Sequence, residues 1–460
     1  MAVRSLEDKI RAAGNPVQML RNATDGPYVF PIPSEFSNWR DEQESWRNTA
    51  VFFDQSHHMT DHYFQGPDVK RLLSDVGINS FKTFGRNKAK QIVVCNHDGY
   101  VIGDSILFGF EDDLVSIVNR PNAGNWVQFH AEQGDYDVTC DVDHRSITHY
   151  TGKRKRYRYE VQGPKAMEIL TRATGGKLPD IKFFNMGEIK IGGREVRVLR
   201  HGMAGAPGLE LMGPFEEKDE IRQAILEAGR DLGIREGGAK AYSTVAHESG
   251  WVPSELPAIY SGDSMKAFRE WLPANGFEAN ASVGGSFVSD SVEDYYLTPM
   301  DLGYSHILKF DHDFIGREAL EKKQNQPHKK KVTLLWNSED VVRVFASQFQ
   351  QGDRFKFMDT PASHYATYPF DAVFANGNRV GMSLYPVYTS NFRRWISLGL
   401  LDEEMAQPGK ELTVLWGEPD GGTRKPNVER HVQTEMRVTV AACPIADDAR
   451  ENYRPHKLPF

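Results

Sequence analysis

The feature that most constrains this chain is a glycine-rich segment, HGMAGAPGLE, at residues 201–210. Three glycines and a proline precede a single carboxylate, Glu210. Glycine admits positive φ and lets a flat ligand approach the backbone closely. A lone carboxylate beyond such a turn can accept a pair of N–H donors from a heterocycle in a charge-assisted contact. The segment therefore predicts a ligand-holding turn, although many glycine-rich turns only reverse the chain.

The length and composition indicate a globular protein of several domains. The chain has 460 residues, which predicts about two to four domains. Hydrophobic residues make up 40% and charged residues 26%, with a net charge of −8, so we expect no nucleic-acid partner. Short basic runs at 153–158 and 329–331 adjoin apolar runs, and we expect both to be solvated loops.

The chain shows no sign of a membrane or secretory segment. Its first fifteen residues contain no apolar stretch, so no secretory signal is expected. No apolar run reaches the length of about 18 residues that spans a membrane. Cys95, Cys140 and Cys443 lie far apart, which predicts reduced thiols rather than a disulfide framework. We therefore expect a cytoplasmic protein with no membrane partner.

The hydrophobic pattern predicts mixed helices and strands. Asn122 is a candidate N-cap for a helix that contains Trp126. The pattern "strand, Gly-Pro, helix" occurs at 63–73 and again at 161–170, which suggests two related halves of the chain. Helices are expected at 5–14, 41–49, 66–76 and 215–232, and strands at 91–95, 100–109 and 114–119.

A polar segment at 322–331 is the best candidate for a linker. It divides the chain into a region at 1–325, which we expect to hold the ligands, and a C-terminal β-barrel domain at 326–460. Strands are expected in the second part at 332–337, 379–384, 395–401, 411–416 and 431–442.

A resemblance to a known family rests on three motifs, which occur in the family's order. They are FDQSHHM at 53–59, HGMAGAPGLE at 201–210 and FIGREAL at 314–320. The chain resembles the folate-dependent aminomethyltransferase family, typified by the glycine-cleavage T-protein. It is most similar to the branch of tetrahydrofolate-dependent aryl O-demethylases that act on syringate, vanillate and 3-O-methylgallate. That closer likeness rests on NRPNAGNW at 119–126, ESGWVPSELPAIYSGD at 248–263, REWLPAN at 269–275 and GGSFVSD at 284–290.

The resemblance implies an α+β fold with a three-domain, aminomethyltransferase-like architecture. The second domain would be ferredoxin-like, and the third would be a small β-barrel. Tetrahydrofolate, the implied cofactor, would lie in a central channel. The implied reaction moves the methyl group of a methoxylated benzoate, with syringate favoured, to N5 of tetrahydrofolate during breakdown of lignin-derived aromatics. Vanillate and 3-O-methylgallate are the alternative substrates of this small-molecule site.

Two departures separate the chain from aminomethyltransferases. The family's Asp-Asp pair is Gly103-Asp104 here, so the first acid is missing. Tyr242 stands where the family has an arginine. Both changes disfavour aminomethyl transfer, and the O-demethylase branch shares both.

The resemblance assigns catalytic roles to Tyr242 and His58. A phenolate leaving group needs a proton or a strong hydrogen bond, which the Tyr242 hydroxyl could donate. His58 would contact the substrate near its ring oxygens. His57 and His58 would point in opposite directions in a strand, so only one should face the pocket. From the residues alone, a buried aromatic and a core histidine stay open.

Arg120 is the expected partner of the benzoate carboxylate, because its planar fork makes a bidentate contact. An ion pair with Glu111 or Asp112 is the alternative. The expected pocket walls are Tyr28, Phe30, Gln55 and Phe287, with core packing as the alternative for each. Phe30 replaces a tyrosine of the vanillate-type pattern, which favours a substrate with a second methoxy group.

Glu210, with Gly208 and Trp251, is expected to bind the cofactor. Glu210 would hold the N–H edge of the pterin, unless it only caps a helix or lies on the surface before Gly213-Pro214. No metal is expected to take part. Two alternative functions stay open, namely another folate-dependent methyl or aminomethyl transferase and a folate-binding protein without turnover. The sequence does not determine the oligomeric state.

Overall fold

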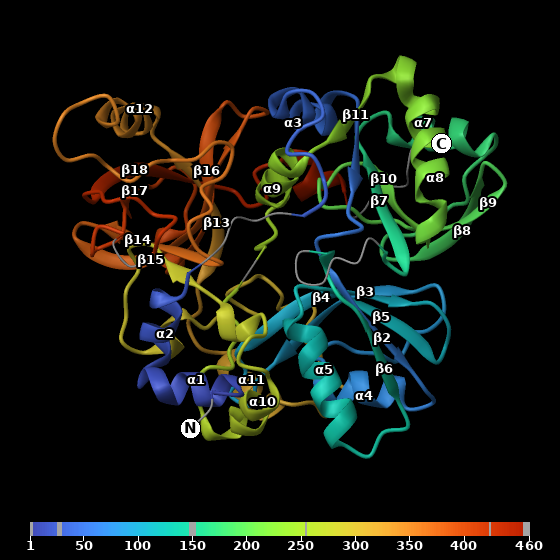
Figure 1. Ribbon diagram of the computed structural model, residues 1–460, viewed down its shortest axis with the longest axis horizontal. Coiled ribbons are helices and arrows are strands. Elements are labelled where there is room, and N and C mark those ends of the chain that lie inside the picture. Colours follow the sequence, from blue (N-terminus) through green and yellow to red (C-terminus); the bar gives the residue numbers. More distant parts are fainter. Residues whose placement is uncertain (1–2, 25–29, 147–152, 254, 423–424, 454–460) are drawn as a thin grey trace.

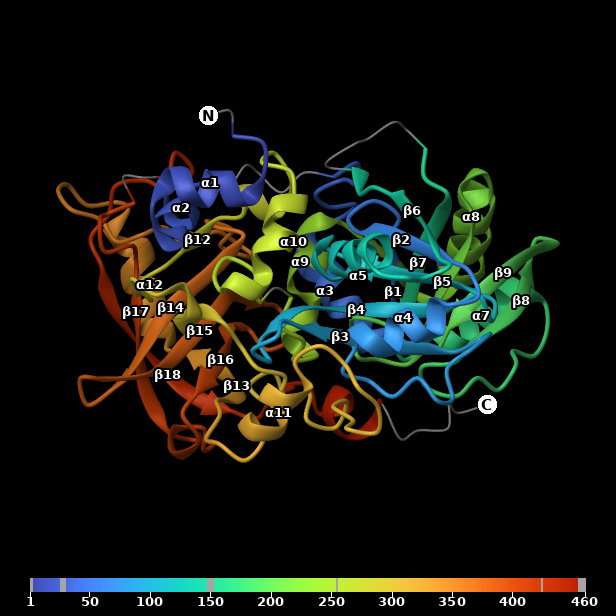
Figure 2. The same ribbon diagram turned by 90° about the horizontal axis from the view of Figure 1, so that it is seen from below.

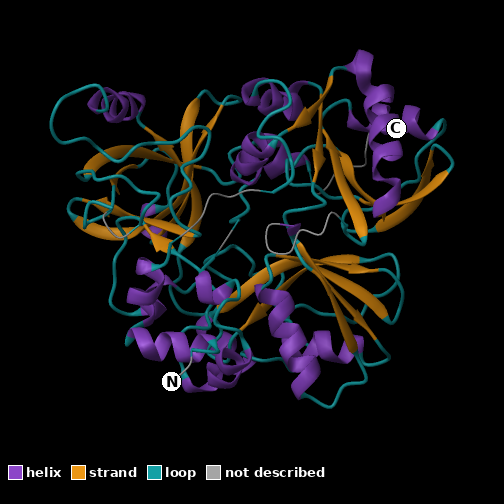
Figure 3. Cartoon of the chain, viewed as in Figure 1, coloured by secondary structure: helices purple, strands orange, loops and turns teal. Residues whose placement is uncertain are grey.

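The computed structural model describes residues 3–24, 30–146, 153–253, 255–422 and 425–453. Three β-sheets form its framework, with most helices at the periphery (Figures 1 and 3). In Figure 1 a barrel occupies one side, and two open sheets lie one above the other on the opposite side. The predicted α+β architecture with a C-terminal barrel is thereby confirmed.

The first sheet has five antiparallel strands in the order β3-β4-β5-β2-β6. Helix α5 packs against β4 and β5, and α4 packs against α5 (Figure 2). The apolar face of α4 consists of the four residues that the 3.6-residue period predicts, all of them buried. The elements are β2 (Thr60–Gln65), α4 (Val69–Val76), β3 (Ala89–Cys95), β4 (Val101–Gly109), β5 (Leu114–Asn119), α5 (Asn122–Gln133) and β6 (Thr139–Asp143).

The second sheet has six strands in the order β11-β1-β7-β10-β9-β8. Only the β1–β11 pair is parallel among them. Helices α7 and α8 pack together, and α3 contacts β1, β11 and α9. The elements are α3 (Trp39–Asn48), β1 (Ala50–Asp54), β7 (Arg156–Gln162), α7 (Ala166–Thr174), β8 (Met186–Ile191), β9 (Arg194–Leu199), β10 (Gly208–Pro214), α8 (Lys218–Gly229), β11 (Ile234–Gly237) and α9 (Ala239–Glu248).

The third sheet closes into a barrel. Its strands run in the order β14-β15-β16-β13-β18-β17, and pairing of β14 with β17 completes the ring. Closure leaves no exposed strand edge in the ring. The short strand β12 adds to β14 from the chain ahead of the barrel. The elements are β12 (Val283–Gly284), β13 (Lys330–Trp336), α12 (Ser338–Ser347), β14 (Tyr368–Ala375), β15 (Asn378–Thr389), β16 (Arg394–Leu401), β17 (Glu411–Trp416) and β18 (Thr434–Ala441).

Four further helices flank this framework. Helix α1 packs on α2 and α10, and α2 also contacts β12, so the N-terminal helices lie against the barrel side of the molecule (Figure 2). Among the described residues, no helix combines the length and the apolar character that crossing a membrane requires. The helices are α1 (Leu6–Ala13), α2 (Pro16–Asn22), α10 (Lys266–Trp271) and α11 (Arg317–Lys323).

The repeated "strand, Gly-Pro, helix" pattern is present in the structure. Strand β2 leads through Gly66 to α4, and β7 leads through Gly163 to α7. Both glycines have positive φ, +151° and +136°. A Cβ at Gly66 would lie 2.0 Å from the backbone oxygen of Asp137, and one at Gly163 would lie 2.5 Å from that of Thr49. Each glycine therefore permits a close backbone approach that no other residue allows.

Three local predictions are wrong. The run 153–158 is not a solvated loop, because it enters β7 and buries Arg154 and Arg158 against acidic partners. Asn122 does not cap α5, since the helix begins at Asn122 itself after Pro121, which makes no side-chain cap. The run 329–331 is likewise not a solvated loop, because Lys330 and Lys331 begin strand β13. Strand β14 and helix α12 were not predicted. The domain boundary at 325 and 326 stays a prediction.

The buried carboxylate of Glu248 joins the second sheet to the barrel. Its Oε2 accepts hydrogen bonds from the Trp46 indole at 3.0 Å and from Arg47 at 3.2 Å, both on α3. Its Oε1 accepts from Thr389, at the end of β15, at 2.5 Å and from Asn391 at 3.0 Å. Glu248 ends α9, so one side chain fixes this helix against both neighbours.

We expect Glu248→Ala to lower the free energy of unfolding by about 3 kcal/mol or more, because removal of the carboxylate leaves the partly buried Arg47 and the buried donors of Trp46 and Thr389 unpaired. Urea denaturation followed by circular dichroism measures this change. The matched control is Glu339→Ala, which removes an exposed ion pair with Arg437 and should cost about 1 kcal/mol or less. Equal losses in the two variants would contradict the role of Glu248.

Candidate active site

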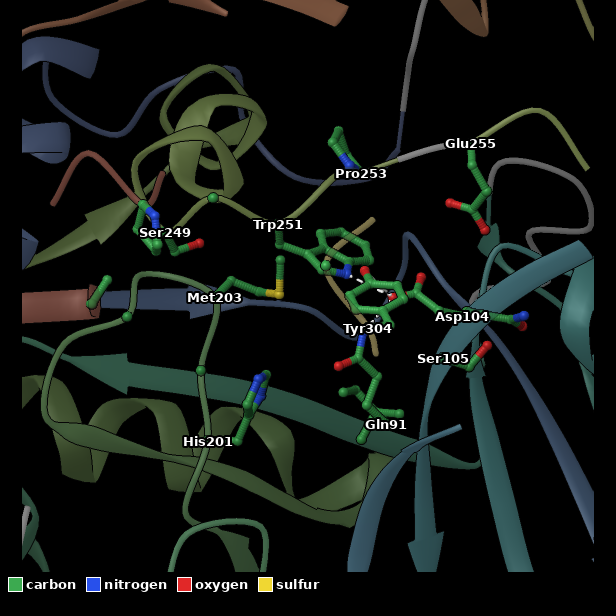
Figure 4. A pocket seen from close by; sticks show the side chains of 18 of the residues that line it. Gln91, Asp104, Ser105, His201, Met203, Ser249, Trp251, Pro253, Glu255 and Tyr304 are labelled. Atoms are coloured by element: carbon green, nitrogen blue, oxygen red, sulfur yellow. Dashed lines mark hydrogen bonds between the residues drawn. The ribbon is translucent and has the colours of Figure 1, made fainter. Parts of the chain in front are cut away.

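A cavity of about 550 Å³ is lined by residues of both open sheets and of the barrel strand β13. Figure 4 shows side chains of its wall from close by. Its lining residues come from β4, β10, α9, the start of β13 and the C-terminal segment. Six predicted site residues line this one cavity, namely Gln55, His58, Arg120, Glu210, Tyr242 and Trp251. The structure thus brings together residues that are up to about two hundred positions apart in the sequence.

A phenol, an imidazole and an amide meet at one side of the cavity. The Tyr242 hydroxyl lies 2.9 Å from Nε2 of His58. Nε2 of Gln55 donates a hydrogen bond to the same hydroxyl oxygen at 3.3 Å. Tyr242 is placed by α9, whereas the other two residues follow β1 in a turn. The Tyr242 oxygen is therefore oriented from two directions.

His58 is held in its neutral form. Burial lowers its pKa well below the ordinary histidine value, and the nearby positive charges of Arg158 and Arg145 act in the same direction. A neutral imidazole has one donor and one acceptor nitrogen. His58 can therefore either accept a proton in a hydrogen bond from Tyr242 or donate one to it.

As predicted, only one of His57 and His58 faces the cavity. The predicted reason, alternation of side chains along a strand, is wrong. Residues 55–59 form a turn after β1 rather than a strand. Nδ1 of His57 lies 2.7 Å from the Ser146 hydroxyl, and its ring packs edge-on against Phe215. Only His58 of the two lines the cavity.

Glu210 is buried in the middle of β10, and therefore neither caps a helix nor lies on the surface. Its Oε1 lies 2.7 Å from Nδ1 of His201, and its Oε2 accepts from Arg158 at 3.2 Å. Burial by itself would raise the pKa of Glu210, but the contacts with His201 and Arg158 outweigh this effect and lower it. Glu210 is therefore an ionised carboxylate, and its two oxygens retain lone pairs for N–H donors of a ligand.

Three donors converge on a single oxygen of Asp104 on the opposite wall (Figure 4). Oδ2 accepts from Gln91 at 2.5 Å, from the Trp251 indole at 3.0 Å and from the Tyr304 hydroxyl at 2.7 Å. This cluster fixes the indole of Trp251 at the cavity wall. Sequence reasoning noted Asp104 as half of an altered acid pair and missed the cluster, because no local pattern links its members.

Asp104 shares its wall with a second buried acid, Glu255. Burial raises the pKa of both carboxyls, and the charge of Asp104 raises that of Glu255 further. Since three donors stabilise the ionised form of Asp104, the proton of this pair resides on Glu255.

Gly103, which stands in place of the family's first acid, lies against the start of α5. A Cβ at this position would be 3.3 Å from both Cβ and the backbone nitrogen of Ala123. A larger side chain at position 103 would therefore press on the helix. The close packing of β4 against α5 at this point goes together with the absence of the acid.

Arg120 lies in the cavity wall between β5 and α5. Its positive charge opposes the effect of burial on Glu255. The acids considered as alternative partners contact another residue, since Glu111 lies 3.3 Å from Arg86 and Asp112 accepts from the Arg86 backbone at 3.3 Å. Arg120 therefore lies in the cavity wall and does not pair with Glu111 or Asp112 at residues 111–112.

Other predicted site residues do not line the cavity. Phe287 packs on Tyr295 in the core, with the Arg379 guanidinium 4.6 Å from its ring. Gly208 has a φ of +154°, and a Cβ there would lie 2.0 Å from the backbone oxygen of Val161. This glycine lets β10 approach β7, rather than letting a ligand approach the chain.

Phe30 is buried behind His58, with ring centroids 6.0 Å apart. It contacts the site through that imidazole and is not among the residues that line the cavity. Tyr28 lies outside the described residues.

Sequence reasoning also missed two neighbours of Glu210, the buried Glu160 and the partly buried His201. Glu160 lies opposite Glu210 in the register of β7 and β10, and it accepts a hydrogen bond from Gln55. His201 opens the glycine-rich segment and contacts Glu210. The alternation RYEVQ at 158–162 could have indicated an inward-facing acid, although it could not reveal the partner.

The arrangement supports acid–base chemistry beside a bound ring system. An ionised carboxylate and an indole are suited to a flat, N–H-bearing heterocycle. An arginine in the same cavity is suited to an anionic group. Between them, a phenol oriented by an amide and a neutral imidazole can donate a proton.

Comparisons with known proteins agree with this geometry. A model of the GCVT N-terminal domain matches residues 17–255. The chain is 47% identical over 451 residues, 98% of each chain, to a syringate O-demethylase from Sphingobium sp.. It is 31% identical over 400 residues, 84% of each chain, to a sesamin methylene transferase from Sinomonas sp..

The fold also resembles a solved structure. Glycine cleavage system aminomethyltransferase T from Bartonella henselae superposes with a TM-score of 0.62 at 15% identity, covering 93% of this chain and 95% of that one. At this identity the likeness shows the shared fold alone.

We expect the imidazole of His58 to be neutral already at about pH 6.5, where an unperturbed histidine is half protonated, because burial holds its folded pKa well below that of an unfolded chain. NMR of the histidine ring carbons measures this, with His58→Gln identifying the signal. The same signal should titrate near pH 6.5 when the chain is unfolded in urea. A midpoint in the folded protein equal to or above that of the unfolded chain would contradict the burial effect.

Proposed function

Because the chain belongs to the family of the GCVT N-terminal domain, we propose that it is a tetrahydrofolate-dependent O-demethylase for a methoxylated benzoate. The products would be 5-methyltetrahydrofolate and a phenol. One observation carries this proposal: Glu210, Tyr242 and Arg120 line the same cavity. Similarity to a syringate O-demethylase over 98% of the chain supports it.

The residues present fit the cofactor. Glu210 is an ionised, buried acceptor, and Trp251 presents an indole held in place by Asp104. These groups would hold the N–H edge and the ring face of a reduced pterin. When bound, tetrahydrofolate would supply the N5 lone pair that receives the methyl group.

Tyr242 would donate its proton to the ether oxygen as the C–O bond breaks, and the proton that N5 loses on methylation would restore the Tyr242 hydroxyl. A phenolate is a poor leaving group, because its conjugate acid has a pKa near that of tyrosine, about 10. A positioned acid is worth roughly 10²–10⁴ in rate. Gln55 and His58 would orient the Tyr242 oxygen for this transfer.

Arg120 would bind the carboxylate of the benzoate. A bidentate contact fixes both the position and the plane of a carboxylate. It would hold the ring so that the methoxy carbon lies between the ether oxygen and N5, which lowers the entropic cost of reaction.

Syringate is the favoured substrate, with vanillate and 3-O-methylgallate as alternatives. Phe30 lies behind His58 and has no hydroxyl, so that side of the site does not demand a polar group on the ring. The similarity to a sesamin methylene transferase favours a second candidate, in which a one-carbon unit leaves a methylenedioxy ring.

We expect the protein to form 5-methyltetrahydrofolate when it is incubated with syringate and tetrahydrofolate. Liquid chromatography measures this product, and parallel incubations with vanillate, 3-O-methylgallate and sesamin compare the substrates. Tyr242→Phe should lower kcat by about 10² or more, since it removes the donated proton. The control is Tyr136→Phe, whose hydroxyl donates to Asp75 outside the cavity. Folate binding without product from any substrate would contradict the proposed function.

We expect Glu210→Gln to weaken tetrahydrofolate binding by about tenfold or more, because a charge-assisted hydrogen bond contributes about 1.5–3 kcal/mol. Isothermal titration calorimetry measures the dissociation constant. Glu195→Gln changes an exposed carboxylate on β9 and should bind as the parent does. Unchanged affinity in Glu210→Gln would remove Glu210 from the folate site.

A further inference from the structure

We propose that Glu160 is a positioning residue which sets, through Gln55, the direction of the hydrogen bond at the Tyr242 hydroxyl. An ionised Glu160 makes Gln55 present an N–H group to the Tyr242 oxygen, so that the tyrosine proton is available to the substrate. A neutral Glu160 reverses the amide and takes that proton away from the substrate. This inference rests on the proposed function for its catalytic consequence, but not for its geometry.

Glu160 is fully buried, and both of its oxygens face donors. Its Oε1 accepts from the backbone N–H of Ala204 at 3.2 Å, in the glycine-rich segment. Its Oε2 accepts from Nε2 of Gln55. A carboxylate that faces N–H donors on both sides has the hydrogen-bonding pattern of the ionised form.

This arrangement fixes the orientation of the Gln55 amide. An ionised carboxylate can only accept, so the NH₂ end of Gln55 must face Glu160. The same nitrogen lies 3.3 Å from the Tyr242 oxygen. The tyrosine oxygen therefore accepts from Gln55, and the Tyr242 proton must be directed elsewhere, either to His58 or to a ligand in the cavity.

Protonation of Glu160 would reverse this pattern. A neutral carboxyl carries a hydrogen that needs an acceptor, and the Ala204 N–H is part of the backbone and cannot supply one. Gln55 can, if its amide rotates by half a turn and presents its oxygen. That oxygen would then face Tyr242 as well and accept the tyrosine proton.

The surroundings of Glu160 place this change near neutral pH. Burial, together with the charge of Glu210, raises the pKa of Glu160 to about 8 against the opposing effects of the backbone donors and Arg158. Because the pKa is raised, Glu160 is neutral below about pH 8 and ionised above it. The titratable and charged groups around it are Glu210 on β10, Arg158 on β7, His201 and His58 in the adjoining turns, Tyr242 on α9 and Tyr453 of the C-terminal segment.

The test uses the full chain and 4-hydroxy-3-nitrobenzoate, whose phenolate absorbs visible light and whose binding needs no turnover. In the parent, affinity for the phenolate should rise as the pH increases through about 8. In Glu160→Gln the new amide donates to the Gln55 oxygen, so Tyr242 no longer donates to the ligand. We expect phenolate affinity at pH 9 to fall by about tenfold, since a hydrogen bond to a charged group contributes about 1.5–3 kcal/mol.

The direction of this effect is diagnostic. Removal of a negative charge near the cavity would by itself strengthen binding of an anion, so weaker binding has to come from the lost hydrogen bond. The control is Gln162→Met on the same face of β7, which removes an acceptor for the Ala206 N–H in the same glycine-rich segment. Equal losses in the control and in Glu160→Gln would mean that Glu160 only holds that segment, and would overturn the proposal.

A swapped pair separates polarity from packing. In Q55E/E160Q the hydrogen bond between the two positions and the net charge are retained, but residue 55 offers only acceptors to Tyr242. We expect this variant to bind the phenolate as weakly as E160Q does, and to keep a kcat about one to two orders of magnitude below the parent. Recovery in the swapped variant would overturn the proposal.

The parent enzyme also gives a test that needs no variant. A flat phenolate affinity between pH 7 and 9 would contradict the proposal even if no variant folds. Failure of the proposed function would give a different result, namely no methyl transfer from any methoxybenzoate. The binding measurements with 4-hydroxy-3-nitrobenzoate would still decide the role of Glu160 in that case.

Discussion

The buried carboxylate of Glu248 is the contact on which the arrangement of this molecule depends. It accepts hydrogen bonds from α3 and from the end of β15 while it closes α9. Tyr242 lies six residues earlier on that helix, and Trp251 follows three residues later. Two walls of the cavity are therefore fixed by one side chain that does not itself line the cavity. A buried charge with several hydrogen-bonding partners is costly to disrupt, which makes such a junction rigid.

Two neighbouring acids, Glu210 in the cavity wall and Glu160 beside it, differ in pKa because their surroundings differ. Glu160 and Glu210 are direct neighbours across β7 and β10. Glu210 contacts a histidine and an arginine, which lower its pKa. Glu160 contacts neutral N–H donors, and its burial and the negative charge of Glu210 raise its pKa. Pairs of titratable groups whose environments push their pKa values apart can take different tasks. Here one acid is suited to hold a ligand, and the other is suited to orient a proton donor.

The glycine-rich segment shows how far sequence reasoning reaches. Its position predicted that Glu210 is part of a site, and the structure places that carboxylate in the cavity wall. The expected reason was only partly right, since Gly208 serves the approach of β10 to β7. A Cβ at Gly202 would likewise lie 1.7 Å from the Gln162 side chain. Glycine marks a close approach, but the sequence does not say what approaches.

The sequence by itself determined the family, the periodic helices and strands, and six of the side chains that line the cavity, because motifs and periodicity are local properties. Only the tertiary structure decided which acids are ionised, which donors converge on Asp104, and that Gln55 connects Glu160 to Tyr242. The reason is physical: burial and electrostatic environment come from chain segments that are distant in sequence, so the protonation state of a group is a property of its contacts rather than of its neighbours along the chain.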